Sequence, residues 1–126
     1  MKKIILVIDD EKALLDAIEE LLTLSDYTVH KAYNGKQGLK LARKVKPNAI
    51  LLDILMPDMN GYEVLEALKQ DEETAAIPVI MLSSLTDDMS KIKSAQLYSE
   101  SYLTKPVAFD KLKAKIEEVI KLGPPR

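Results

Sequence analysis

Polar side chains that could bind a metal ion or take part in catalysis follow four apolar runs of this sequence, each at the point where the run ends. They are Asp9 and Asp10, Asp53, Ser83 with Ser84, and Lys105 with Pro106. Three carboxylates that converge in one cleft repel one another and raise each other's pKa unless a cation lies between them. Because oxygen ligands without nearby His or Cys suit Mg²⁺, and Mg²⁺ sites commonly hold phosphate, this set predicts a magnesium-dependent phosphate site.

Asp53 is the candidate nucleophile of such a site. It ends the apolar run in NAILLDILMPDMNG and can accept a phosphoryl group, with Mg²⁺, Lys105 and the Ser83 hydroxyl stabilising the charge on the transferred oxygens. A turn or a helix N-cap also explains a single Asp at this position. Asp9 or Asp10 could likewise cap the helix that follows, and Ser83 could be a turn residue at a strand end. Convergence with the other strand ends is what separates the two interpretations.

The elements that must position these side chains alternate between strand-like and helix-like patterns. The strand-like runs are KIILVI from Lys3, YTVHKA from Tyr27, AILL from Ala49, PVIML from Pro78 and SYLT from Ser101. The helix-like segments cover residues 11–24, 34–45, 62–70, 88–97 and 108–122. This alternation predicts an α/β fold with a parallel sheet between two layers of helices. Since parallel strands bring their carboxyl ends to one edge, the acids, the hydroxyl and the lysine are expected to meet there.

Composition limits the other functions. A chain of 126 residues is expected to form one domain, here residues 1–122 with a short tail at 123–126. The net charge of −2, and the expectation that no Lys/Arg cluster lies on one helix face, argue against direct nucleic-acid binding. The absence of Cys excludes disulfides and thiol chemistry and favours a cytoplasmic location. The apolar run Ile4–Ile8 is too short for a signal-peptide core or a membrane span, so no membrane insertion is expected.

The ordered set of motifs resembles the receiver domain of two-component response regulators over essentially the whole chain. The motifs are IDDE with Asp9 and Asp10, LLDILMPDMNG with Asp53, Met56, Pro57 and Gly61, MLSS with Ser83, and YLTKP with Tyr102, Lys105 and Pro106. Each motif alone is common, whereas their order and spacing together are specific. The resemblance implies a doubly wound five-stranded parallel sheet in the (βα)5 flavodoxin-like order 2-1-3-4-5, as in single-domain chemotaxis-type receivers.

The resemblance also implies a role for each residue of the site. By this resemblance, Asp53 is the phosphoacceptor, and Mg²⁺ is bound by Asp9, Asp10, Asp53 and the Leu55 backbone carbonyl. Ser83 and Lys105 contact the phosphoryl group, and Ser83 and Tyr102 act as the switch. Leu55 and Leu85 flank the route by which water reaches the phosphoryl group. It implies a phosphorylation-controlled signalling switch, not a turnover enzyme, with a sensor histidine kinase or a histidine phosphotransfer protein as phosphodonor. The downstream target is expected to bind the face formed by the fourth helix, the fifth strand and the fifth helix.

Other classes of protein fit this sequence less well. A haloacid-dehalogenase-type phosphatase needs a second acid two residues after the nucleophile, where this chain has Leu55. A flavodoxin-like FMN carrier needs a hydroxyl- and glycine-rich loop after the first strand, where DDEKA would repel the phosphate. A receiver-like docking module that is not phosphorylated stays open as the alternative. One departure from receivers is Tyr98-Ser99 in place of Gly-Ala, which affects the local shape of the partner-binding face.

Overall fold

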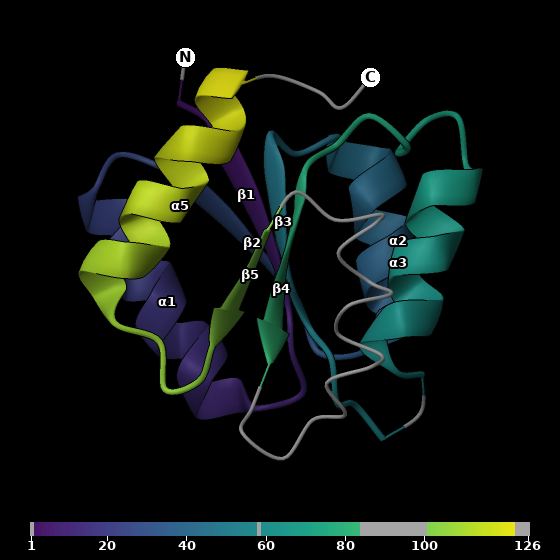
Figure 1. Ribbon diagram of the computed structural model, residues 1–126, viewed down its shortest axis with the longest axis horizontal. Helices are drawn as coiled ribbons and strands as arrows, with labels where there is room; N and C mark the ends of the chain where they lie inside the picture. The colour runs from purple at the N-terminus through teal and green to yellow at the C-terminus, as the bar shows by residue number, and fades with distance from the viewer. Residues whose placement is uncertain (1, 58, 84–100, 123–126) are drawn as a thin grey trace.

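Five strands and four helices make up the part of the chain that the computed structural model describes, residues 2–57, 59–83 and 101–122 (Figure 1). In chain order they are β1 (Ile4–Ile8), α1 (Lys12–Leu24), β2 (Thr28–Ala32), α2 (Gly35–Val45), β3 (Ala49–Asp53), α3 (Gly61–Gln70), β4 (Val79–Ser83), β5 (Ser101–Thr104) and α5 (Phe109–Leu122). Each of these elements ends within one residue of its predicted position. The predicted helix over 88–97, the tail 123–126 and residues Ser84, Leu85, Tyr98 and Ser99 lie outside the described residues.

The sheet has the predicted doubly wound topology. Its five strands are all parallel and lie in the order β2-β1-β3-β4-β5, which confirms the expected 2-1-3-4-5 arrangement. Figure 1 shows the arrowheads of β4 and β5 at the same edge of the sheet, and the parallel pairing brings the carboxyl ends of the other strands to that edge. Every residue of β3 and β4 is buried, because helices cover both faces of these central strands. Residues that follow β1, β3, β4 and β5 are therefore brought to one place.

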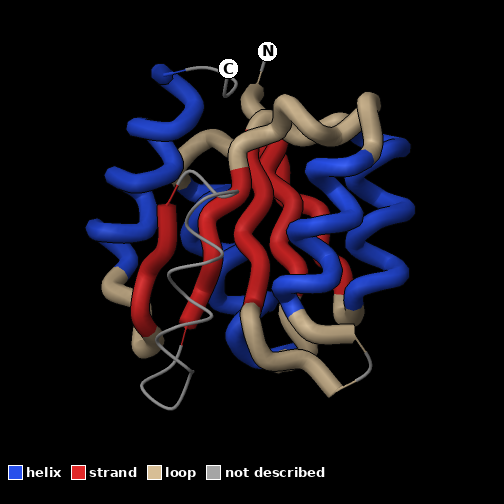
Figure 2. The backbone as a smooth tube through the Cα atoms, turned by 45° about the vertical axis from the view of Figure 1, so that its right-hand side comes forward, coloured by secondary structure: helices blue, strands red, loops and turns tan. Residues whose placement is uncertain are grey.

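Two layers of helices form two apolar cores, one on each face of the sheet. Helices α2 and α3 cover one face, where Ala42, Val64 and Leu68 pack against side chains of the strands. Helices α1 and α5 cover the other face with Leu15 and Ile116 among their buried residues, and Figure 2 shows the sheet between the two layers. None of the helices in the described ranges is long and apolar enough to span a membrane.

Helix α2 is held against the sheet by features that its sequence shows only in part. Asn34 caps its start, since the Asn34 side chain accepts a hydrogen bond from the Gln37 backbone N–H at 2.9 Å. Gly38 weakens a helix by propensity, but here it allows close packing, because a Cβ at this position would lie 2.8 Å from Ile8 Cγ1. Helix α3 starts in the same way, with the Asn60 side chain accepting from the Glu63 N–H at 3.0 Å.

The outer surface of α2 shows that one expectation from the sequence was wrong. The exposed residues Lys36, Lys40 and Lys44 recur every four residues along this helix, and the exposed Arg43 lies three residues after Lys40. At 3.6 residues per turn, their side chains fall within about 100° of the helix circumference. A Lys/Arg cluster therefore does lie on one helix face, and the near-neutral net charge of the chain conceals it because acidic residues elsewhere balance the sum.

Candidate functional site

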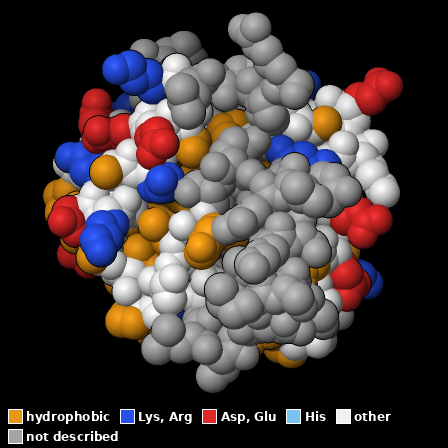
Figure 3. All heavy atoms as spheres, in the orientation of Figure 1, with side chains coloured by type: hydrophobic (Ala, Val, Ile, Leu, Met, Phe, Trp, Pro, Cys, Tyr) orange, Lys and Arg blue, Asp and Glu red, His pale blue; other side chains and the backbone are white. Residues whose placement is uncertain are grey.

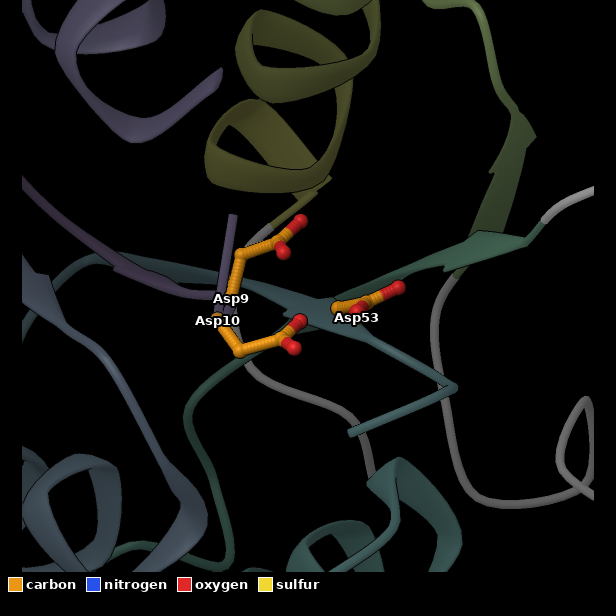
Figure 4. A group of neighbouring side chains, drawn as sticks. All are labelled: Asp9, Asp10 and Asp53. Atoms are coloured by element: carbon orange, nitrogen blue, oxygen red, sulfur yellow. The ribbon is translucent and has the colours of Figure 1, made fainter. Parts of the chain in front are cut away.

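Three carboxylates meet at the carboxyl edge of the sheet, as the strand order requires. Asp9 and Asp10 follow β1, and Asp53 is the last residue of the neighbouring strand β3. One carboxylate oxygen from each lies within 4.8 Å of the others, and Figure 4 shows the three side chains reaching toward the same space. Asp9 and Asp53 are buried, whereas Asp10 is exposed. The sequence prediction that these acids converge is thereby confirmed.

Lys105 supplies the positive charge of this group. Its Nζ atom lies 2.9 Å from Asp9 Oδ2 and 3.1 Å from Asp53 Oδ1, so one ammonium bridges the two buried carboxylates. The backbone holds it there, since the Lys105 N–H donates a hydrogen bond of 2.6 Å to the carbonyl of Ser83 at the end of β4. The Lys105–Pro106 peptide bond that follows is cis.

Burial and like charge shift the ionisation of Asp53. Its pKa rises from the ordinary 3.8 to about 6, mainly because burial disfavours the charged form, and the charge of Asp9 adds to this. The hydrogen bond and charge of Lys105 act in the opposite direction and offset only part of the rise. Burial lowers the pKa of Lys105, but its bonds with Asp9 and Asp53 outweigh that effect and leave the pKa raised. The site is therefore short of positive charge, with three carboxylates around one ammonium.

The donor set fits a hard divalent cation. The ligand atoms within reach are carboxylate oxygens, and among the described residues the group contains neither His nor Cys. Mg²⁺ prefers oxygen ligands and usually keeps several waters, which suits a site with one exposed and two buried acids. A cation here would also offset the buried charge and the repulsion from Asp9, the two effects that raise the pKa of Asp53. The residues present thus fit the predicted Mg²⁺ on chemical grounds.

Asp9 lies both at the start of α1, as a helix cap would, and in contact with the other charged residues of the site. Its Oδ1 atom accepts a hydrogen bond from the Glu11 backbone N–H at 2.9 Å, next to the start of α1, while Oδ2 contacts Lys105. Both oxygens of this buried carboxylate therefore have a partner within the protein. Asp10 is the more accessible of the pair, because its side chain is exposed beside the same space.

The other predicted residues lie around the acids in different environments. Ser83 is buried, and its hydroxyl donates a long hydrogen bond of 3.4 Å to the Leu103 carbonyl. Tyr102 is 37% exposed on β5, on the sheet face opposite Leu103, which packs against the α1 and α5 core. Leu55 follows Asp53 by two residues and is 55% exposed. Ser83 and Lys105 are thus linked through the β4 and β5 backbones, and Tyr102 stands three residues before Lys105.

Gly61, which the sequence shows only as part of the motif around Asp53, allows a close backbone contact. Its N–H donates a hydrogen bond of 2.7 Å to the Ile54 carbonyl, which folds the loop after β3 back on itself. A Cβ at Gly61 would collide with the carbonyl oxygen of Asp53 and lie 2.7 Å from Ile54 Cα. Only glycine fits this close approach, so the backbone that carries Asp53 is positioned by the first residue of α3.

Comparison with known proteins agrees with this geometry. The family model of the response regulator receiver domain matches residues 5–117. Protein PilH from Pseudomonas aeruginosa is 36% identical over 116 residues, which cover 92% of this chain and 96% of that protein. The DNA-binding dual master transcriptional regulator RpaA from Synechocystis is 35% identical over 117 residues, 93% of this chain but only 48% of that regulator. This chain therefore spans about half the length of several relatives that it matches.

A solved structure shows the same fold. A putative response regulator from Chloroflexus aurantiacus superposes with a TM-score of 0.88 at 26% identity, covering 96% of this chain and 99% of that one. The parallel strand order and the acidic site at the carboxyl ends of the strands place this chain in the class of doubly wound α/β domains, which bind their ligands at that edge of the sheet. Within that class, the family match over most of the sequence shows that this chain belongs to the response regulator receiver domains, which serve as switches in two-component signalling.

Replacing Asp53 should stabilise the metal-free protein in a pH-dependent way. Because the carboxyl pKa is about 6 in the folded protein and 3.8 in its ordinary state, the folded state binds the proton more tightly. Stability therefore falls as pH rises from about 4 to about 6. Asp53→Asn removes this loss, so it should raise the free energy of unfolding at pH 7 by up to about 3 kcal/mol, and by much less at pH 4. Urea denaturation in excess chelator at both pH values measures the difference.

The matched control is Glu72→Gln, which neutralises an exposed carboxylate in the turn after α3. It should change stability little at either pH. Equal stabilisation of Asp53→Asn at pH 4 and pH 7, or destabilisation at pH 7, would show that the buried charge does not strain the fold.

Proposed function

We propose that this domain is a phosphorylation-controlled switch in which Asp53 accepts a phosphoryl group from a histidine kinase or a histidine phosphotransfer protein. The observation that carries the proposal is the Asp53 carboxylate itself, which lies at a strand end beside Lys105 and two further acids. Family membership supports the same assignment. Residues 1–122 act as the unit, and a cytoplasmic location stays a prediction from the cysteine-free composition.

The chemistry is a displacement at phosphorus by an Asp53 oxygen. A new O–P bond forms while the P–N bond of the donor's phosphohistidine breaks, and the electron pair of that bond leaves with the imidazole. Lys105 already lies 3.1 Å from an Asp53 oxygen, which is close enough for its ammonium to stabilise negative charge on the transferred oxygens. Among the described residues, the Ser83 hydroxyl has one partner, the Leu103 carbonyl at 3.4 Å, and it can turn toward the same oxygens.

The metal ligands of the proposal are Asp9, Asp10, Asp53 and the Leu55 backbone carbonyl. Mg²⁺ held by them would supply positive charge beside the phosphoryl oxygens and offset the repulsion among the three carboxylates. Asp10 is exposed and therefore has the freest oxygens, while Asp9 is engaged by Glu11 and Lys105. We assign Asp10 the larger share of metal binding for this reason.

The modified protein then acts by changing a surface, and it does not turn over a substrate. Tyr102 is the proposed reporter because it is partly exposed on the strand that leads directly into Lys105. If Ser83 moves toward a phosphoryl oxygen, the adjoining part of β5 can rearrange and Tyr102 can turn inward. This would shift the population between two existing conformations and change how β5 and α5 present themselves to a downstream target.

Phosphorylation of Asp53 should require both the carboxylate and Mg²⁺. Wild-type protein incubated with acetyl phosphate and Mg²⁺ should gain the mass of one phosphoryl group in intact-mass spectrometry. Asp53→Asn and wild type in excess chelator should gain none, whereas Asp110→Asn on α5 should behave like wild type. An adduct on Asp53→Asn, or full labelling in chelator, would contradict the proposal, and no adduct on wild type would favour the unphosphorylated docking module.

The two acids after β1 give a further control on the same experiment. Asp10→Ala should weaken Mg²⁺ binding, measured by NMR titration, more than Asp9→Ala does. Asp9→Ala should instead lower the melting temperature more, because it removes buried bonds to Glu11 and Lys105. The reverse ranking in both measurements would exchange the roles proposed for these residues.

The conformational response should appear on β5 and α5. We expect NMR shifts of Tyr102 and of the start of α5 to change when the protein carries the phosphoryl group, because Ser83 and Lys105 link the site to this strand. Phosphorylated Ser83→Ala should show smaller changes there. Shift changes confined to α1 and α2 would contradict this path.

The lifetime of the phosphoryl group should depend on Leu55. Its exposed apolar side chain offers no hydrogen bond to orient a water for attack, so self-dephosphorylation is expected to be slow. Leu55→Asn should shorten the lifetime, by roughly tenfold if oriented water stabilises the transition state by about 1.4 kcal/mol. Loss of phosphate is followed by mass spectrometry after the donor is removed. Leu24→Asn, at an 80% exposed position on α1, is the control, and an equal effect of both variants would exclude a local role for Leu55.

A further inference from the structure

Helix α2 presents a row of cations that the phosphorylation site does not use. Lys36, Lys40 and Lys44 are exposed at intervals of four residues, which places them along one side of the helix at steps of about 6 Å. Arg43 lies beside these lysines, and α2 itself contains no acidic residue. Within the described part of the chain, Arg43 is the one of these four cations with an ion-pair partner, Asp71, at 3.6 Å. We refer to Lys36, Lys40 and Lys44 as the basic row.

Helix α3, beside α2 on the same face of the sheet, presents the opposite charge. Glu63 and Glu66 are exposed on α3, and Asp71, Glu72 and Glu73 continue the negative charge in the turn that follows. Figure 3 shows acidic side chains along the right-hand margin of the molecule, where Figure 1 places α3 and the turn after it. Lys69, the basic residue of α3, is half-buried and donates to the Ala75 and Ile77 carbonyls. We refer to Glu63, Glu66 and Asp71 as the acidic row.

A shallow groove of about 240 Å³ separates the two helices toward their carboxyl ends. Leu39, Ala67 and Leu68 are among its lining residues, so part of its surface is apolar. Arg43 and Asp71 also line it, one from each side, and form an ion pair across it at 3.6 Å. The surface formed by α2 and α3 therefore has a basic side, an acidic side and a partly apolar groove between them.

The two rows match in height along the helices. Both helices follow an Asn cap, start at the carboxyl edge of the sheet and run in the same direction away from it (Figures 1 and 2). Lys40 is the sixth residue of α2 and Glu66 the sixth residue of α3. Lys36 and Glu63 are the second and third residues of their helices, so they also lie at similar heights.

We propose that the α2 and α3 face binds the same face of a second copy of this chain. A two-fold axis parallel to the helices places α2 of each copy over α3 of the other, so the basic row of one copy meets the acidic row of its partner twice. Lys40 would lie opposite Glu66 of the partner subunit in both halves of this pair. This interface forms independently of phosphorylation at Asp53 and does not involve β5 or α5.

The charges on this face favour a second copy in this arrangement over other arrangements and over other binding partners. A two-fold axis perpendicular to the helices would place α2 against α2, and the like charges of the two basic rows would repel. A nucleic acid or an anionic membrane broad enough to cover the face would also meet the acidic row next to the basic one. A second copy satisfies both rows at once, and the net charge of −2 adds little overall repulsion.

Charge reversal tests the proposed pairing directly. Sedimentation velocity of the unphosphorylated protein at up to about 1 mM should show weak self-association near 0.01 M salt, where the Debye length is about 30 Å. Self-association should disappear near 1 M salt, where the Debye length is about 3 Å. Lys40→Glu and Glu66→Lys should each weaken self-association by at least about tenfold, since each change makes both halves of the interface repulsive. An equimolar mixture of the two variants should restore it, because every Lys40–Glu66 contact in the mixed pair is again between opposite charges.

Matched controls separate this pairing from general charge effects. Lys111→Glu and Glu117→Lys make the same charge changes at exposed positions of α5 and should leave self-association as in wild type. The absence of Cys also permits a single spin label at Lys44→Cys on an unlabelled chain, mixed with ¹⁵N-labelled wild type. Relaxation enhancement should then appear on α3 of the ¹⁵N-labelled chain.

Four results would overturn the proposal. They are a wild type that stays monomeric at 1 mM in low salt, a variant mixture that does not associate, enhancement that falls on α2 or α5 of the partner, and control variants that weaken association as strongly as Lys40→Glu. Binding of a polyphosphate probe that Lys40→Glu abolishes, in a wild type that does not self-associate, would assign the basic row to polyanions.

Discussion

The repulsion among three carboxylates at one edge of the sheet is the constraint on which the rest of this structure depends. Parallel strands β1 and β3 are neighbours, so the acids that end them cannot avoid one another. Burial raises the cost of holding them together, and the pKa of Asp53 at about 6 reflects that cost. Lys105 offsets part of it through contacts with Asp9 and Asp53. The fold thus keeps a site that is short of positive charge, which supports the proposal that it takes up a cation and a phosphoryl group.

The central strands and the loop after β3 hold the site against this repulsion. All residues of β3 and β4 are buried between the helix layers, which supplies apolar burial on both sides of Asp53. Gly61 closes the loop by packing onto the Asp53 carbonyl, and the Lys105 N–H is bonded to Ser83. Backbone contacts therefore position the residues that carry the Asp53 carboxylate and the Lys105 ammonium.

Much of this could be predicted from the sequence, because each step follows from a local pattern. Alternating strand and helix signals give the parallel sheet, and a parallel sheet brings Asp9, Asp53 and Lys105 to one edge. Sequence patterns could not show that the Lys105 ammonium bridges the carboxylates of Asp9 and Asp53, or that Asp9 also accepts a hydrogen bond next to the start of α1. These are properties of distances, which periodicity does not contain.

The basic surface of α2 was missed for a different reason. The net charge of −2 is a sum over the chain, and such a sum cannot distinguish mixed charges from separated ones. Spacing along α2 does contain the signal, since Lys36, Lys40 and Lys44 recur every four residues. Gly35 and Gly38 disfavour a helix by propensity, yet both allow close packing against Val64 and Ile8. Net charge failed here because it ignores position on the helix surface.

The two helix layers are connected to the site through different residues, Gly61 on one side of the sheet and Lys105 on the other. On one side, α3 begins at Gly61, which lies so close to the Asp53 carbonyl that a Cβ there would collide with it. On the other side, Lys105 contacts the Asp53 carboxylate directly and leads through Pro106 to α5. The face of α2 and α3 carries neither Lys105 nor Ser83, which suits it to an interaction that does not depend on phosphorylation. The side of β5 and α5, which follows Lys105, is the one that can respond to the chemistry at Asp53.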